Sequence, residues 1–314
     1  MLPRRTFVQT IAAAALLGVA FTGTVFAQDK FPSKDITFVV QAAAGGASDR
    51  TSRAIAAELE KDLGVSVIVE NRPGATGTVA FAHVAEQPAD GYTIGFGPVE
   101  FAIVEHLGYD FDRKDYTYLG QVMNSPVVLA VPANSPYNTL AEFIEAGQTK
   151  ELSVSNSGAA SSFAATAFTL SQMTGAKLTQ VPFDGGAPAV AAALGNHVDA
   201  VTAGAGETAT AFADGSLKVL AIFADEEHPR FPGVKTAKEQ GYDLTFGAWG
   251  GIYGPAGIPE DARAILEESI KKAAASQTFL DAITPAGILP TYKTGAEWEA
   301  FIETEAARYA EVLK

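Results

Sequence analysis

The segment Ile36–Gly77 constrains the fold most strongly, because it combines a strand, a glycine-containing turn, a helix and a second strand. The β-branched run Ile36–Val40 leads into the turn, the helix ends at Gly64, and the apolar run Val65–Val69 follows. This order is typical of a βαβ unit with parallel strands. Ligands of such sheets bind beyond the carboxyl ends of the strands, where the free N–H groups of helix starts favour an anion.

The same alternation of strands and helices continues along the chain in two series. The first series extends to a strand at Tyr92–Gly97, and the second occupies residues 127–223. In the second series we expect strands at Val127–Val131, Leu152–Ser155, Leu178–Phe183, Val198–Thr202 and Leu217–Phe223. Helices are expected near Leu140–Ala146, Ser161–Thr174, Ala187–Leu194 and Glu207–Ala213, and later at Pro259–Ser276 and Gly295–Val312.

Two α/β series with a C-terminal return predict an α/β fold with two lobes, each a sheet flanked by helices, and a ligand cleft between the lobes. We assign residues 28–125 and 247–314 to lobe 1, and residues 126–246 to lobe 2. The chain would cross between the lobes near Val122–Val131 and Thr245–Gly254. The helix at Gly295–Val312 carries aromatic residues on one face, which predicts that it docks onto the fold.

The first 27 residues have the features of an export signal. Arg4 and Arg5 precede the apolar run Ile11–Val19, and Val25-Phe26-Ala27 offers a small-residue cleavage site. We therefore predict a signal peptide at residues 1–27 and a periplasmic location for the mature protein. The paired arginines also resemble a twin-arginine signal, so the general and the twin-arginine export routes both remain open.

The formal charge of −14 and the absence of cysteine limit what the chain can bind. A strongly acidic protein is a poor partner for nucleic acid or for an anionic membrane surface. Without cysteine there is no disulfide and no thiol chemistry. We expect a soluble monomer whose partner is a small molecule. An anionic ligand would have to be held by local groups, because the overall charge repels it.

Signals for catalysis are weak in this sequence. The four histidines are scattered without paired metal-ligand spacing, and no G-x-S-x-G motif provides a serine nucleophile. We therefore predict no catalytic residues, no metal site and no cofactor. The rival interpretation rests on Gly204–Ala209, which matches G-x-G-x-x-A after a predicted strand and would suit an exported α/β enzyme that uses a nucleotide.

Three loops that each join a predicted strand to a predicted helix have the features of an anion site. Their glycines let the backbone approach a ligand, and their serine and aspartate residues suit the N-cap position. Arg50 and Arg53 could grip a carboxylate directly, but their position in the first helix favours an outward, solvated face. The candidate binding residues are Gly45, Gly46, Ala47, Ser48, Asp49, Ser157, Gly158, Ser161, Gly185 and Gly186, with Thr76 from a further glycine turn.

Short motifs occur in a characteristic order along the chain: Phe31–Lys34, Gly45–Asp49, Val69–Ala75, Ala89–Thr93, Val181–Ala189, Gly195–Asp199 and Phe231–Gly241. In order and spacing they resemble the periplasmic substrate-binding proteins of tripartite tricarboxylate transporters, the Bug family. The resemblance extends over about Phe31–Lys314.

This resemblance implies a two-lobed clamshell that captures a small carboxylate, such as a di- or tricarboxylate, and delivers it to membrane permease subunits. It also implies that Gly45–Asp49, Ser157, Gly158 and Ser161 hold one carboxylate, with Gly185 and Gly186 nearby. A binding protein that feeds a signalling receptor is an alternative, since a docking surface has no readable motif.

The sequence departs from the family pattern in two places where a pocket wall is expected. Gln41, Ala42 and Ala44 replace the usual proline and phenylalanine before the glycines, and Pro98–Phe101 replaces the usual small residues after the third strand. Glu100 could therefore place an acceptor opposite the bound carboxylate, which would suit a ligand with a hydroxyl or an amine. These departures leave the identity of the ligand open.

Overall fold

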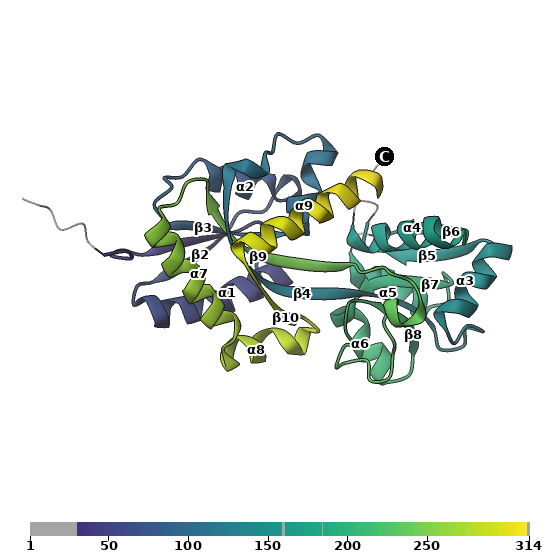
Figure 1. Cartoon of the computed structure of the whole chain (residues 1–314). Coiled ribbons are helices and arrows are strands. Elements are labelled where there is room, and N and C mark those ends of the chain that lie inside the picture. Colours follow the sequence, from purple (N-terminus) through teal and green to yellow (C-terminus); the bar gives the residue numbers. More distant parts are fainter. Residues whose placement is uncertain (1–29, 159–160, 184, 313–314) are drawn as a thin grey trace, which may run out of the picture. The chain divides into compact units, whose positions relative to one another are not determined.

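A mixed sheet of ten strands runs through this computed structural model, which describes residues 30–158, 161–183 and 185–312 (Figure 1). The predicted signal peptide lies outside the described residues. The strands are β1 (Ile36–Val40), β2 (Val67–Asn71), β3 (Thr93–Pro98), β4 (Tyr116–Pro132), β5 (Leu152–Asn156), β6 (Leu178–Pro182), β7 (Ala200–Gly204), β8 (Leu217–Phe223), β9 (Gly247–Pro255) and β10 (Leu289–Thr294). The α-helices are α1 (Ala47–Leu63), α2 (Thr78–Ala85), α3 (Leu140–Thr149), α4 (Ser162–Thr174), α5 (Gly186–Leu194), α6 (Ala205–Ala213), α7 (Glu260–Ala274), α8 (Gln277–Ile283) and α9 (Gly295–Val312).

Two sets of parallel strands belong to this sheet. β1 pairs in parallel with β2 and β3, and β5 pairs in parallel with β6 and β7. Both sets alternate with helices, so the two predicted α/β series are confirmed. The βαβ prediction for Ile36–Gly77 is also confirmed, because α1 ends at Gly64, whose left-handed φ of 73° stops the helix. The second strand begins at Val67 and not at Val65.

The antiparallel strands β4 and β9 join the two parallel sets. β4 pairs with β9 from Tyr116 to Pro126, and from Val127 onward it pairs with β7 and β8. Figure 1 shows both strands extending from the region of β1–β3 to the region of β5–β8. The strand expected at Val127–Val131 is thus only part of a 17-residue strand. The predicted lobe boundaries near residues 126 and 246 stay predictions.

Strand β9 was missed in the sequence because its segment Gly247–Pro255 is rich in glycine, which is unfavourable in strands. The structure shows why glycine is required there. A Cβ atom on Gly251 would lie 2.5 Å from the carbonyl oxygen of Gly120 and 2.8 Å from the Cα of Gln121. Close packing between β4 and β9 therefore overrides local strand preference. Helix α8 and strand β10 were also not predicted.

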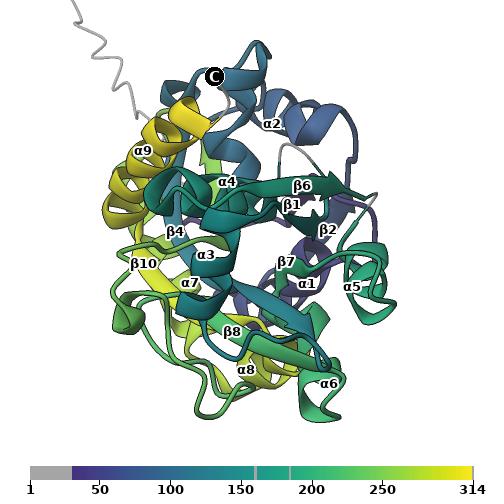
Figure 2. The same cartoon turned by 90° about the vertical axis from the view of Figure 1, so that its right-hand side faces the viewer.

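The last helix, α9, packs against β4 and β10, as Figure 2 shows. The side chains of Trp298, Ile302 and Tyr309 on one face of α9 are buried, so the predicted docking face is confirmed. The Trp298 ring meets the ring of Tyr118 edge to face, with 5.6 Å between centroids. Such aromatic pairs add to the stabilisation from burial alone.

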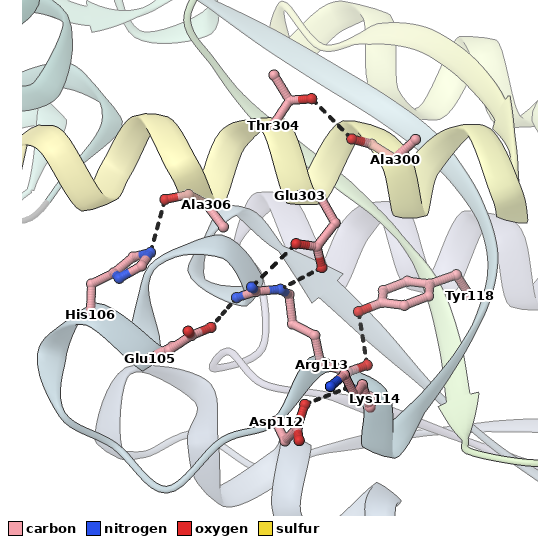
Figure 3. Close-up of polar contacts among 10 residues, drawn as sticks. All are labelled: Glu105, His106, Asp112, Arg113, Lys114, Tyr118, Ala300, Glu303, Thr304 and Ala306. Atoms are coloured by element: carbon pink, nitrogen blue, oxygen red, sulfur yellow. Dashed lines mark hydrogen bonds and ion pairs between the residues drawn. The ribbon is translucent and has the colours of Figure 1, made fainter.

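Polar contacts fix the outer side of α9 to the segment before β4 (Figure 3). The Arg113 guanidinium forms ion pairs with Glu105 and with Glu303 of α9, and its Nε atom lies 2.9 Å from Glu303 Oε1. His106 Nε2 lies 2.8 Å from the carbonyl oxygen of Ala306, also on α9. The Arg113 side chain is 16% exposed, whereas the Glu105 and Glu303 side chains are 44% and 57% exposed.

Replacing Arg113 with glutamine should lower the free energy of unfolding by only about 1 kcal/mol, because Glu105 and Glu303 can regain hydration. Urea denaturation at low and high salt measures this effect. The difference from the wild type should shrink as salt increases, because salt screens ion pairs at the surface. Glu303→Gln removes one of the two carboxylates that pair with Arg113, and its destabilisation should also shrink as salt increases. A loss that is large and insensitive to salt would contradict this explanation.

Candidate functional site

A cavity of about 640 Å³ lies where α1, α4 and α6 begin. The middle strands contribute Ser125 from β4 and Ala248 from β9, and the segment 282–288 lines another side. Helix starts present N–H groups without intrahelical acceptors, so this is the type of place where the sequence predicts an anion. The lining residues are Ala47, Arg50, Met123, Ser125, Phe163, Gly204, Gly206, Glu207, Ala248, Ala282, Pro285, Ala286 and Ile288.

Asp49 organises the first predicted binding loop from within the protein. Its Oδ2 atom accepts a hydrogen bond from the Gly45 amide at 2.9 Å, and its carboxylate contacts Arg53 at 3.0 and 3.1 Å. Asn71 Nδ2 donates to Asp49 Oδ1 and to the Ala42 carbonyl oxygen, both at 2.9 Å. The Asp49 side chain is buried, and both of its oxygens have protein partners. It is therefore a positioning residue, which sets the path of the backbone from Ala42 to the start of α1.

Gly46 is the N-cap residue of α1, so the predicted serine or aspartate N-cap at this helix is wrong. Asp49 instead lies in the first helical turn, where its carboxylate reaches back to the loop. The Arg50 amide donates to the Gly46 carbonyl at 3.0 Å, which is the first hydrogen bond of the helix. The amides of Ala47 and Ser48 precede that bond and have no intrahelical acceptor. They are the donors that α1 offers to an anion, and Ala47 lines the cavity.

Arg50 lies on the wall of the cavity with an exposed side chain. The expected solvated position of Arg50 is confirmed, and the same exposed side chain also lies on the cavity wall. Among the residues that the structure describes, Arg50 forms no ion pair, and no other lining residue carries a positive charge. Arg53 differs, since its guanidinium is engaged by Asp49 and Asn71. Arg50 is thus the arginine that is free to meet a ligand.

Ser161 caps α4, as predicted. Its Oγ accepts from the Ala164 amide at 3.1 Å and donates to the Gly158 carbonyl at 2.6 Å. Gly158 has a φ of +133°, and its amide donates to Asn156 Oδ1 at 3.0 Å. The sequence Asn156-Ser157-Gly158 predicts a turn, and this hydrogen bond agrees with that prediction, although Asn156 was not among the candidate binding residues. These bonds shape the loop, while Ser157 remains half-buried and residues 159 and 160 lie outside the description.

Glu207 connects the third predicted loop to the start of α6. Its Oε2 accepts from the Gly204 amide at 2.9 Å, and its Oε1 lies so near Gly186 that a Cβ there would be 1.9 Å away. Gly185, with a φ of 111°, is the N-cap of α5. Desolvation raises the pKa of the Glu207 carboxyl, and the Gly204 hydrogen bond offsets only part of this. Glu207 was not among the predicted site residues, although a glutamate in the third helical position is a recognisable capping signal.

Close packing explains the second glycine of Gly204–Ala209, Gly206. A Cβ atom on Gly206 would lie 1.9 Å from the carbonyl oxygen of Ala286. In a dinucleotide site the corresponding space admits a pyrophosphate. Here the backbone of the segment before β10 occupies that space, and Glu207 places a carboxylate at the same helix start. This geometry opposes a nucleotide at α6.

Of the predicted binding residues, Ala47 belongs to the set that lines the cavity, and the others lie outside that set, including Thr76 and Glu100. Thr76 is exposed and has a left-handed φ of 57°. Glu100 is half-buried in the short 3₁₀ helix η2 (Val99–Ala102), which contacts α9, and burial raises the pKa of its carboxyl. Its neighbour Phe101 is fully buried and packs against Phe81 in an aromatic cluster. Roles for Thr76 and Glu100 in binding stay predictions.

Several cavity residues carried no sequence signal. Met123, Ser125 and Ala248 come from the paired strands β4 and β9, and Phe163 from the first turn of α4.

Within the described ranges, no group of three or more metal-ligating side chains could hold a metal ion. Over the same residues, no helix has the length and apolar character needed to cross a bilayer.

Comparison with known proteins places the chain in a family. The model of the family described as "Tripartite tricarboxylate transporter family receptor" matches residues 51–314. The chain belongs to this receptor family. The resemblance seen in the sequence is thereby confirmed. Among similar proteins, BugT of Bordetella pertussis is 27% identical, and the match covers 91% of this chain and 90% of BugT. A Cupriavidus necator protein encoded in the gbd 5′ region is 28% identical, and the match covers 92% of this chain and 90% of that protein.

Several solved structures share this fold. A TctC solute-binding protein from Polaromonas has a TM-score of 0.86 and 29% identity, and the match covers 90% of this chain and 99% of that one. MatC from Rhodopseudomonas palustris, solved with bound malate, has a TM-score of 0.71 and 29% identity, and the match covers 90% of this chain and 100% of MatC. Another R. palustris protein, solved with adipate, has a TM-score of 0.73 and 25% identity, and the match covers 90% of this chain and 97% of that protein.

These likenesses confirm the predicted two-lobe α/β fold of periplasmic binding proteins. This member of the receptor family is therefore a solute-binding protein.

Proposed function

We propose that the chain is exported to the periplasm, captures a small organic carboxylate in the 640 Å³ cavity and delivers it to the permease subunits of a tripartite tricarboxylate transporter. The observation that carries this proposal is the position of Arg50. An arginine without an ion-pair partner in the described structure lines a cavity where three helices begin. The malate and adipate bound by two structural relatives support the same ligand class.

A carboxylate at the start of α1 would receive hydrogen bonds from the amides of Ala47 and Ser48 and a charge-assisted contact from Arg50. The positive end of the helix dipole adds to this attraction. Guanidinium groups suit carboxylates because their parallel N–H donors match the two oxygens. Such local attraction is needed, since the whole chain carries a formal charge of −14.

Family membership and the export signal predicted at residues 1–27 support delivery to a permease. The alternative of delivery to a signalling receptor uses the same ligand chemistry, and uptake of labelled ligand by vesicles that contain the permease distinguishes the two. The rival nucleotide-using enzyme is disfavoured by the contact between Gly206 and the Ala286 carbonyl.

A thermal-unfolding screen of mono-, di- and tricarboxylates tests carboxylate capture. A ligand present at about 100 times its Kd should raise the free energy of unfolding by about 2.7 kcal/mol. The ligand should also be recovered unchanged after incubation, since binding involves no turnover. 1,6-Hexanediol, which has the skeleton of adipate without its carboxylates, is the matched control. If no carboxylate stabilises the protein more than this diol does, the proposal is wrong.

A further inference from the structure

Two charged side chains line the described cavity, and they have opposite signs. Arg50 comes from the first turn of α1, and Glu207 comes from the first turn of α6. No ion pair joins them within the described structure, so each charge remains available to something else. A site built for a plain carboxylate needs the arginine and gains nothing from the glutamate.

The Glu207 carboxylate is held in place. Oε2 is fixed by the Gly204 amide at 2.9 Å, while Oε1 lies against Gly186, where only the absence of a Cβ leaves room. The side chain nevertheless stays exposed on the cavity side. A carboxylate held in this way offers a fixed acceptor to a ligand.

The charge of Glu207 discriminates among organic acids. A second carboxylate on the ligand would meet a like charge at Glu207 in a protein that already carries a formal charge of −14. A protonated amine would instead complete an ion pair there, and its N–H groups would satisfy the free carboxylate oxygen. The apolar side chains of Met123, Phe163 and Ile288 line the same cavity and suit a hydrocarbon portion of the ligand.

We infer that the cavity selects an amino carboxylate, with its carboxylate at Arg50, its ammonium group at Glu207 and its carbon skeleton against Met123 and Phe163. This inference rests on the proposed carboxylate capture and narrows it to one ligand class. It also transfers to Glu207 the acceptor role that the sequence predicted for Glu100.

Matched ligand pairs test the inference by isothermal titration calorimetry at pH 7. The pairs are 6-aminohexanoate with hexanoate, leucine with 4-methylpentanoate, and 2-aminoadipate with adipate. Hexylamine serves as the ligand with an amine alone. In at least one pair the amino form should bind the wild-type protein at least ten times more tightly than its partner, and hexylamine should bind more weakly than either.

Glu207→Gln should reduce that preference to about twofold or less while the plain monocarboxylates hexanoate and 4-methylpentanoate keep their affinity. Glutamine retains an oxygen that can accept from the Gly204 amide, so α6 keeps its cap. Glu297→Gln is the matched control, because Glu297 Oε2 accepts from the Thr294 amide at 2.9 Å at the start of α9 and does not line the cavity. This control should preserve the full preference.

The pH provides a second measurement that needs no variant. The tight binding of an ammonium group requires an ionised Glu207, whose pKa lies above the ordinary glutamate value. The amino preference should therefore fall as pH decreases through that pKa. The Glu207→Gln variant should show no such dependence.

The outcomes separate this inference from the proposed function. If plain carboxylates bind the wild type as tightly as their amino partners, or if Glu207→Gln leaves a preference intact, the inference is wrong while carboxylate capture stands. If neither member of any pair binds, and no other carboxylate stabilises the protein, both are wrong.

Discussion

Arg50→Gln should weaken carboxylate binding by about tenfold to a hundredfold, because a charge-assisted hydrogen bond contributes about 1.5–3 kcal/mol. Arg50 lines the cavity and lacks an ion-pair partner in the described structure, so its loss should leave the unfolding free energy almost unchanged. Calorimetry with the carboxylate that gives the largest thermal shift measures the affinity. Some affinity should remain, because the amides of Ala47 and Ser48 would still donate hydrogen bonds to the carboxylate.

Two variants control this experiment. Arg50→Lys keeps the charge but loses the paired donors, so it should recover part of the affinity. Arg263→Gln removes an arginine that is paired with Glu267 on α7, at 2.8 Å, and that does not line the cavity. It should bind like the wild type. If Arg50→Gln also binds like the wild type, backbone amides hold the carboxylate without help from a guanidinium.

Asp49→Ala should lower the free energy of unfolding by about 1–3 kcal/mol, because the Gly45 amide, the Asn71 side chain and Arg53 would lose a buried acceptor. The loop before α1 would lose its fixed path, so carboxylate binding should weaken too. Urea denaturation measures the first effect and calorimetry the second. Asp62→Ala is the control on the same helix, because Asp62 forms a surface ion pair with Lys272 at 3.1 Å and should cost less than about 1 kcal/mol.

The Asp49 effect should depend on pH in a definite direction. Desolvation raises the pKa of Asp49, but hydrogen bonds from Arg53, Gly45 and Asn71 together outweigh it and hold the pKa below its ordinary value of 3.8. As the pH falls, the Asp49 carboxylate is therefore protonated at a higher pH in the unfolded chain than in the folded protein. The stabilisation by Asp49 is complete above the unfolded pKa and is lost as pH falls through the folded one. The difference between wild type and Asp49→Ala should accordingly shrink below about pH 4. A difference that is constant down to pH 2 would refute this assignment.

The sequence predicted those elements whose apolar pattern repeats clearly. The strands β1 and β8 and the helix α9 occur at the predicted residues, and α1 ends at its glycine. The first half of β4, and all of β9, could not be found in this way. The residue types in these strands are determined by close packing against a partner strand. At Gly251, for example, a Cβ atom would clash with the Gly120 carbonyl oxygen. Local propensity carries no information about such pairing.

The candidate site was predicted in part for the same reason. Loops that follow parallel strands lie at one edge of a sheet, so the start of α1 could be chosen from the sequence alone. The direction of the Arg50 side chain depends on where α6 and the segment 282–288 lie in the folded chain. Asp49 and Ser161 were recognised as important polar residues, and their hydrogen bonds to Gly45 and Gly158 could be found only in the folded structure.

The strand order β3-β9-β4 has a consequence for how the chain matures. β9 is made from Gly247–Pro255, yet it fills the gap between two strands that are synthesised long before it. Until that segment has left the ribosome or an export channel, β3 and β4 each carry an unpaired edge. Unpaired edges are the places where chains aggregate or are captured by chaperones. A nascent chain that stalls before residue 247 therefore cannot close its sheet, however complete its second α/β series already is.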